Sequence, residues 1–173
     1  HQSKIFAVLF YLCTFILVSN SYGDHFNFNV PSTNSFMFFY GDVFTINNVP
    51  SEPGDEIAVY DPQGTFCGHY MVTNAGEFVV AVYGDDTTTP EDEGASLNED
   101  LVFVVWDASE AVEITLTNAM FIQKDAFGKP QIDTIPPKYL GNNEIRGMGI
   151  SIANNSPKIS LIENQHTIID HPI

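Results

Sequence analysis

The chain of 173 residues carries 22 acidic side chains against 6 basic ones, a formal net charge of −16. This length supports one domain, and a hydrophobic fraction of 44% is ordinary for a globular chain. The charge argues against a nucleic-acid binder and against binding to anionic membranes, because both kinds of binding depend on Lys and Arg. Length, composition and charge therefore restrict the class of protein but do not indicate an activity.

The first 23 residues differ in kind from the rest. Lys4 is followed by an apolar run from Ile5 to Val18 and then by a small, polar stretch that ends at Gly23. A base, a short apolar run and a small-residue exit are the parts of a secretory signal peptide, and the run is shorter than the ~20 residues of a membrane span. We therefore expect cleavage after Gly23 and a secreted or cell-surface protein. A retained anchor and a hydrophobic helix packed inside a filament remain open as alternatives.

Hydrophobic periodicity predicts strands through most of the remaining chain. The expected strands cover residues 35–46, 56–60, 65–73, 77–83, 101–106, 111–117, 145–152 and 158–162. The strand at 56–60 ends in the turn Asp61-Pro62-Gln63-Gly64, where Pro presets φ and Gly accepts a positive φ. The run at 101–106 is nearly all apolar, which predicts a strand covered on both faces.

No amphipathic helix with caps is visible after residue 24, and the stretch 125–143 is expected to be a long loop or an excursion between strands. Short strands separated by Gly, Pro, Asn and Asp predict an all-β fold, an antiparallel β-sandwich of the jelly-roll or immunoglobulin-like type, built as a single domain over residues 24–173. Once the N-terminal segment is removed, Cys67 is the one remaining cysteine, so no disulfide framework is expected.

The acids are distributed unevenly. Residues 24–123 contain no Lys or Arg, and five carboxyl groups fall between residues 85 and 93. Hard oxygen ligands in a turn-rich loop suit Ca²⁺, although the spacing is not that of an EF-hand. We take as ligands Asp85, Asp86, Asp92 and Glu93, with Asp61 as a supplement. The alternative is that these acids cap turns and face water.

Two further acids, Asp55 and Asp100, each stand just before an apolar run. Capping of nearby N–H groups is the favoured interpretation, because Asp side chains commonly bond to the backbone in turns. A contribution to a cation site at the same end of the fold is the other.

Cys67-Gly68-His69 resembles a catalytic pair only superficially. A Cys/His nucleophile needs the base within hydrogen-bond reach of the thiol, whereas a free Cys in an apolar strand is usually a small core residue. We find no nucleophile elbow, P-loop or zincin helix in the chain. We therefore predict a protein that is not an enzyme.

Aromatic side chains suggest a second kind of binding, because ring faces stack on sugars. The candidates are Trp106, Tyr40, Tyr60, Tyr70 and Tyr83. In strands such side chains are more often half-buried, and the pattern alone shows no exposed platform for a sugar.

Four segments form a series: Asn34-Ser-Phe-Met37, the stretch from Pro53 to Gly68 (PGDEIAVYDPQGTFCG), Val82 to Ala95 (VYGDDTTTPEDEGA) and Leu101 to Asp107. The series resembles a module that recurs in large exported bacterial surface proteins. The resemblance implies an extracellular β-sandwich, often beside adhesion or binding domains, with no settled enzymatic activity. Residues 97–100 replace a Gly-Asp pair of that pattern, and residues 108–173 lie outside it.

These observations predict a non-enzymatic extracellular module, stabilised by calcium, in a cell surface, matrix or filament. Its expected partners are other copies of itself or neighbouring surface proteins. A carbohydrate-binding module of an exported protein, with a polysaccharide as its partner, is the alternative. An enzyme that acts on a glycan or a peptide ranks third.

Overall fold

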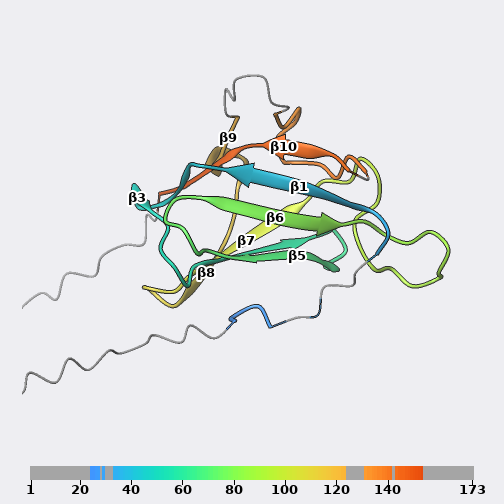
Figure 1. The fold of residues 1–173 in the computed structure, drawn as a ribbon, viewed down its shortest axis with the longest axis horizontal. Helices are drawn as coiled ribbons and strands as arrows, with labels where there is room; N and C mark the ends of the chain where they lie inside the picture. Colours follow the sequence, from blue (N-terminus) through green and yellow to red (C-terminus); the bar gives the residue numbers. More distant parts are fainter. Residues whose placement is uncertain (1–23, 28, 30–32, 124–130, 142, 154–173) are drawn as a thin grey trace, which may run out of the picture.

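The structure is a computed structural model that describes residues 24–27, 29, 33–123, 131–141 and 143–153 (Figure 1). Over these residues the chain is all-β, apart from one short 3-10 helix, as the sequence predicts. The elements are β1 (Phe36–Gly41), β2 (Phe44–Ile46), β3 (Val49–Pro50), β4 (Glu56–Tyr60), β5 (Phe66–Met71), β6 (Phe78–Tyr83), β7 (Val102–Asp107), β8 (Val112–Thr115), η1 (Asn118–Met120), β9 (Phe121–Ile122), β10 (Ile145–Gly147) and β11 (Gly149–Ile152). The proposed export segment 1–23 and the expected strand 158–162 lie outside the described residues.

The described strands form three sheets, in the orders β10-β1-β6, β3-β2-β11-β9 and β5-β4-β7-β8. Most neighbours pair antiparallel, but β1 with β10 and β2 with β11 pair in parallel, which the prediction of an antiparallel fold did not include. Parallel neighbours need a long connection. Here β10 and β11 come about a hundred residues after β1 and β2, so the intervening chain supplies it.

The expected single strand at 35–46 is interrupted after Gly41. A Cβ added at Gly41 would lie 2.1 Å from the Met148 carbonyl oxygen and 2.6 Å from the Phe78 ring. Only glycine fits where these chains approach so closely. The bend therefore lets one continuous stretch of chain contribute β1 to one sheet and β2 to another.

The core lies between the sheets and draws on all three. Its largest fully buried side chains include Phe39 of β1, Phe44 of β2 and Phe103 of β7. The Phe103 ring meets the Phe39 ring edge-on, with centroids 5.7 Å apart. Because side chains alternate across a strand, the neighbours of these core residues project from the outer faces of the sheets.

The prediction that the strand at 101–106 is covered on both faces is wrong. Phe103 and Val105 are buried, but Val102 is 37% exposed and Val104 is half-buried. An all-apolar run does not say which of its faces is covered, because Val is tolerated on a half-exposed sheet surface.

A hairpin between β2 and β3 was not predicted. Asn47 and Asn48 have φ of 55° and 63°, the left-handed values that a two-residue type I′ turn requires and that Asn tolerates. Among the described residues, none belongs to a helix with the length and apolar content needed to cross a membrane.

Candidate functional site

The outer face of the β10-β1-β6 sheet is rich in aromatic and aliphatic side chains. We call the following set the aromatic face: Phe36, Phe38 and Tyr40 of β1, Val79, Ala81 and Tyr83 of β6, and Ile145 of β10. The strand register places Phe38 between Ala81 and Ile145, and pairs Tyr40 with Val79. The face thus results from one alternation shared by neighbouring strands.

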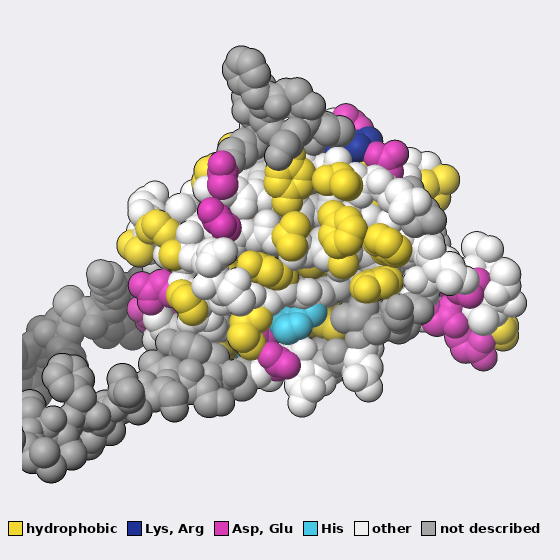
Figure 2. Space-filling view, in the orientation of Figure 1, with side chains coloured by type: hydrophobic (Ala, Val, Ile, Leu, Met, Phe, Trp, Pro, Cys, Tyr) yellow, Lys and Arg dark blue, Asp and Glu magenta, His cyan; other side chains and the backbone are white. Residues whose placement is uncertain are grey.

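These side chains stay accessible in the described structure. Val79 is 51% and Ile145 is 50% exposed. The rings of Phe36 and Phe38 pack edge-on with centroids 5.5 Å apart, and Tyr83 lies 6.0 Å from Phe36. Figure 2 shows hydrophobic side chains gathered over the middle of this side of the molecule, above β1, β6 and β10. Large contiguous apolar patches on soluble proteins commonly mark interaction sites.

A groove of about 730 Å³ crosses this face. It is lined by Phe38 and Tyr40 together with Asn143, Glu144 and Arg146. Arg146 Nη1 lies 2.5 Å from a Glu144 carboxyl oxygen, so the guanidinium is paired. The groove therefore combines aromatic rings with amide and carboxyl oxygens.

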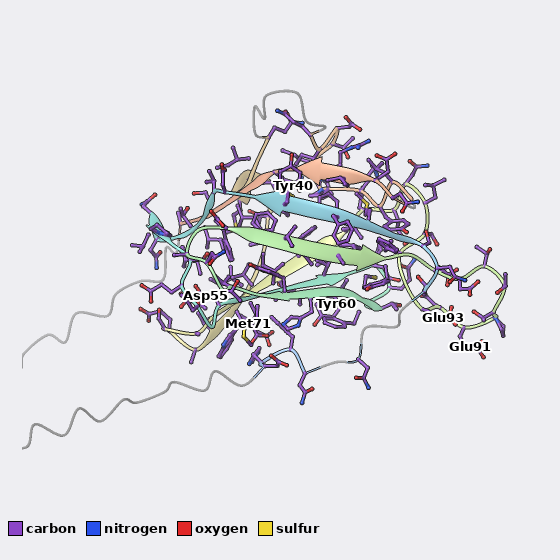
Figure 3. The ribbon with its side chains drawn as sticks, in the orientation of Figure 1. Tyr40, Asp55, Tyr60, Met71, Glu91 and Glu93 are labelled. Carbon is purple, nitrogen blue, oxygen red and sulfur yellow. The ribbon has the colours of Figure 1, made fainter. Side chains whose placement is uncertain are left out.

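The acidic loop after β6 projects away from the sheets, with Glu93 on it (Figure 3). Asp86 accepts hydrogen bonds from the backbone N–H of Thr88 at 3.0 Å and from its hydroxyl at 2.7 Å, and these bonds lower the pKa of Asp86. The Thr89 hydroxyl lies 2.7 Å from both Glu93 oxygens. Asp85 accepts the N–H of Glu93 at 3.3 Å.

The other two predicted ligands, Asp61 and Asp92, meet at Thr65. Asp61 is 2% exposed and accepts the Thr65 N–H at 2.7 Å, which closes the turn after β4. Asp92 accepts the Thr65 hydroxyl at 3.0 Å and so ties the acidic loop to that turn.

All five predicted calcium ligands therefore accept hydrogen bonds, four of them from their own turn or loop and Asp92 from Thr65 in the turn after β4. Within the described ranges, no group of three or more His, Cys, Asp or Glu side chains is arranged to hold a metal ion. A Ca²⁺ ion at the loop would have to replace several of these hydrogen bonds by coordination. Calcium binding stays a prediction.

Cys67 and His69 do not form a pair. The β4–β5 register shifts so that Gly68 faces Val59 and Phe66 faces Tyr60, which leaves Cys67 as the extra residue of a β-bulge. Burial, assisted by the Asp61 carboxyl group, raises the pKa of the Cys67 thiol to about 12. A thiol held protonated at that depth is a poor nucleophile.

His69 instead bonds to a buried acid. Glu56 is 0% exposed, and its Oε2 lies 2.8 Å from Nε2 of His69. The same carboxyl group accepts the backbone N–H groups of His25 and Phe26, at 2.6 and 3.0 Å. The sequence offered no signal for this cluster, because Glu56 follows a turn, where an exposed acid is usual.

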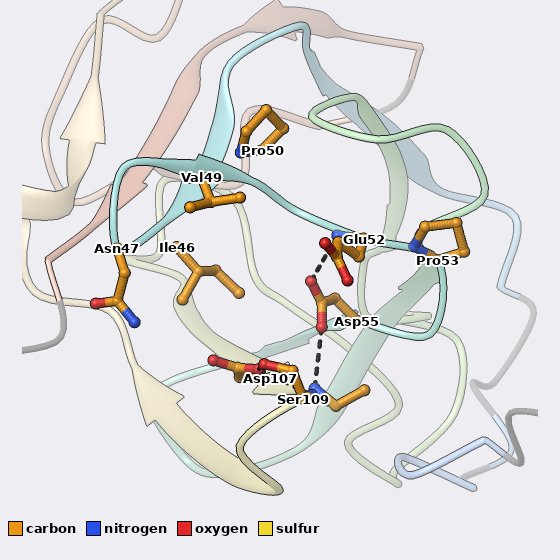
Figure 4. A pocket seen from close by; sticks show the side chains of 10 residues that line it. Ile46, Asn47, Val49, Pro50, Glu52, Pro53, Asp55, Asp107 and Ser109 are labelled. Carbon is orange, nitrogen blue, oxygen red and sulfur yellow. Dashed lines mark hydrogen bonds between the residues drawn. The ribbon is translucent and has the colours of Figure 1, made fainter.

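A pocket of about 300 Å³ between β2, β3 and the β7–β8 turn holds two buried acids (Figure 4). Asp55 accepts the N–H groups of Glu52 and Ala108, at 2.8 and 2.9 Å. Asp107 accepts the Ser109 N–H at 3.0 Å. Burial raises the pKa of Asp55, although the backbone bonds oppose the rise. Asp55 thus caps turns, as we favoured from the sequence, while Asp100 pairs with Lys138.

Comparison of the chain with protein-family models, with curated proteins and with solved structures finds no match. The resemblance to the exported surface module therefore stays an expectation.

Proposed function

We propose that this chain is a non-enzymatic module of an exported protein, which acts by binding a neighbouring protein through the aromatic face. A β-sandwich of the jelly-roll or immunoglobulin-like type is the arrangement we propose for its sheets. Two observations support this arrangement: the core contains side chains from all three sheets, and the regular elements of the described residues are one short 3-10 helix and otherwise strands.

The observation that carries the proposal is the exposure of aliphatic and phenylalanine side chains side by side on a regular sheet. Val79 and Ile145 are half exposed beside Phe38, where a solvated sheet would carry polar residues. Burial of such side chains against a partner is favourable by about 25 cal/mol per Å². Aromatic and aliphatic groups with few charges are typical of the centre of a protein–protein interface.

The chain's charge restricts the partner. Two molecules that each carry −16 repel one another at low ionic strength, so a second copy would bind more tightly as salt is added. A basic partner would show the opposite salt dependence. One titration with salt therefore distinguishes a second copy from a basic neighbouring surface protein.

Secretion and stabilisation by calcium belong to the same proposal. The apolar run at 5–18 supports secretion, and the acid-rich, base-free span 24–123 supports stabilisation by calcium. Comparison of melting temperatures with calcium and with a chelator tests calcium binding. Unchanged values for the native chain and for Asp85→Ala would remove calcium from the proposal.

Carbohydrate binding is the second candidate. Tyr40 lies in the groove together with Asn143 and Glu144, and a ring face beside amide and carboxyl oxygens is the combination that a sugar site needs. Retention of the chain on an insoluble polysaccharide, lost on Tyr40→Ala, would favour this function over protein binding.

Lysine substitution at the aromatic face tests the main proposal. We expect Val79→Lys together with Ile145→Lys to weaken self-association or partner capture at least tenfold, because each buries a charge in the contact. Sedimentation velocity over a range of salt concentrations measures self-association, and binding to purified neighbouring surface proteins measures partner capture.

Val49→Lys is the matched control, because Val49 is 53% exposed on β3 and lies outside the aromatic face. It should leave binding unchanged. Equal effects of Val49→Lys and Val79→Lys would overturn the assignment of the face.

A further inference from the structure

A separate piece of chain covers part of the outer face of the β5-β4-β7-β8 sheet. Residues 24–27, the docked segment, lie against it and precede β1 (Figure 1). Their partners are distant in sequence: Glu56 lies 30 or 31 residues away and Glu113 lies 88 residues away.

The backbone of the docked segment is held by one buried acid. Glu56 accepts the N–H of His25 through Oε1 and the N–H of Phe26 through Oε2. The remaining described partner of Glu56 is His69. An acid with no exposed surface needs its hydrogen bonds, because burial of an unsatisfied carboxyl group is costly. The carboxyl group of Glu56 therefore needs a segment on this face that donates backbone N–H groups to it.

The side chains of the docked segment are recognised as well. The His25 ring stacks on the Trp106 ring, with centroids 3.6 Å apart and an angle of 3° between the planes. His25 Nε2 lies 2.7 Å from Glu113 Oε1. Phe26 is 3% exposed, and its ring lies 6.3 Å from that of His69. The contact thus recognises a His-Phe pair on a bent stretch of chain.

We propose that Glu56, His69, Trp106 and Glu113 form a peptide-docking site, and that a second copy of this chain can fill it with its own residues 24–27. Every contact described above involves only residues 25 and 26 of the segment. An identical segment from another copy makes the same contacts, which is the condition for exchange of an element between protomers. Concentration and the reach of the connection then decide between the two arrangements.

The connection to the body of the molecule is short. Thr33 is fixed on the body, since its hydroxyl donates to the Gly84 carbonyl at 2.6 Å. Six chain steps join Asn27 to Thr33 and reach roughly 20 Å at full extension. Exchange would therefore hold two copies in close contact. This inference involves a different sheet from that of the aromatic face and does not rest on the proposed function.

The first experiment tests the docking site with a peptide. Trp106 is the chain's one tryptophan, so its fluorescence reports on the site alone. The full chain carrying His25→Ala and Phe26→Ala should show an altered Trp106 emission. The synthetic peptide Asp-His-Phe-Asn-Phe-Asn, residues 24–29, should bind this variant saturably and restore the native emission. The same peptide with Ala at both positions is the control and should not bind.

Receptor variants show which residues hold the peptide. Adding Glu56→Gln to the double variant should weaken peptide binding about tenfold or more, because an amide cannot accept all the hydrogen bonds that the carboxyl group accepts. Glu113→Gln should weaken it severalfold. Since the Glu113 side chain is 55% exposed, this variant keeps the fold even if Glu56→Gln does not.

The second experiment tests exchange between copies. The chain with Glu56→Gln supplies an intact segment, and the chain with His25→Ala and Phe26→Ala supplies an intact receptor. Mixing the two should give a mixed dimer in light scattering and restore the native Trp106 emission of the receptor chain. Peptide binding without a mixed dimer would overturn the assignment of a second copy as occupant. An unchanged Trp106 emission in the double variant would overturn the docking site itself.

Discussion

The aromatic face and the outer face of the β5-β4-β7-β8 sheet are built by the same alternation of side chains, but the first is open to solvent and the second is partly covered by the docked segment. On the aromatic face, β1 and β6 present Phe38, Tyr40 and Val79 to solvent. On the outer face of the β5-β4-β7-β8 sheet, β4 and β7 present Glu56 and Trp106, and the docked segment packs on both. Both faces arise from simple strand alternation.

The difference shows what a single acid does on an apolar surface. The side chains of the aromatic face need no hydrogen-bond partner, because apolar groups can face water without one. Glu56 demands hydrogen-bond donors, and two of its described donors are backbone N–H groups of the docked segment. We therefore expect substitutions on the covered face to change stability and substitutions on the open face to change binding.

The largest effect is expected for Glu56→Leu. Leucine fills a similar volume but leaves two backbone N–H groups and the His69 ring without their acceptor. We expect a loss of about 2–4 kcal/mol in the free energy of unfolding, limited at the upper end because the segment can detach into water. Urea denaturation measures it. Glu77→Leu, at an exposed acid just before β6, is the control and should change stability by less than about 0.5 kcal/mol.

Replacement of one ring on each face gives a smaller difference. Phe26→Ala removes a side chain that is 3% exposed and should cost about 2 kcal/mol, while Phe38→Ala, at a half-buried ring, should cost about 1 kcal/mol. Only Phe26→Ala should change the emission of Trp106. Equal losses of stability and equal emission spectra would show that the two faces do not differ as described.

Lysine at the edge of the open face should barely affect folding. Ile145→Lys places its charge at a position that is 50% exposed, so the free energy of unfolding should stay within about 0.5 kcal/mol of the native value. Differential scanning calorimetry checks this. Val102→Lys, at a 37% exposed position on the other sheet, gives the comparison. A large drop in melting temperature for Ile145→Lys would mean that the aromatic face is part of the core.

The local elements were largely predictable from the sequence. The strand at 56–60 was predicted with its observed bounds, because an apolar run is followed there by a Pro-Gly turn. The two-residue strands β3 and β9 were missed, since so short a pairing leaves no periodicity. Asn47-Asn48 did carry a turn signal. The parallel pairing of β1 with β10 could not be predicted from the sequence, because which strands become neighbours depends on packing across the whole fold.

The candidate sites were less predictable for a physical reason. In β1, the inward side chains Met37 and Phe39 and the outward side chains Phe36 and Phe38 are all apolar, so the sequence does not show which face meets solvent. The docked segment was equally hidden. Its interaction with Glu56 joins residues 30 apart through backbone N–H groups, which have no sequence signature.

The smallest effect is expected at Asp86, an acid that accepts hydrogen bonds as Glu56 does but from the exposed loop. The Thr88 hydroxyl and N–H lower the pKa of Asp86, so they favour its ionised form in the folded state. Their contribution to stability is therefore present above the unfolded pKa, about 3.9, and is lost as the pH falls through the lower folded value. Thr88→Val should raise the pKa of Asp86 part of the way to its ordinary value, because the N–H remains. Carboxyl NMR titration measures this shift, with Thr87→Val as the control, and an unchanged pKa would show that the hydroxyl does not hold Asp86. The contrast with Glu56 then follows from burial, since water can replace the partners of the exposed Asp86, whereas Glu56 is fully buried and loses contact with water.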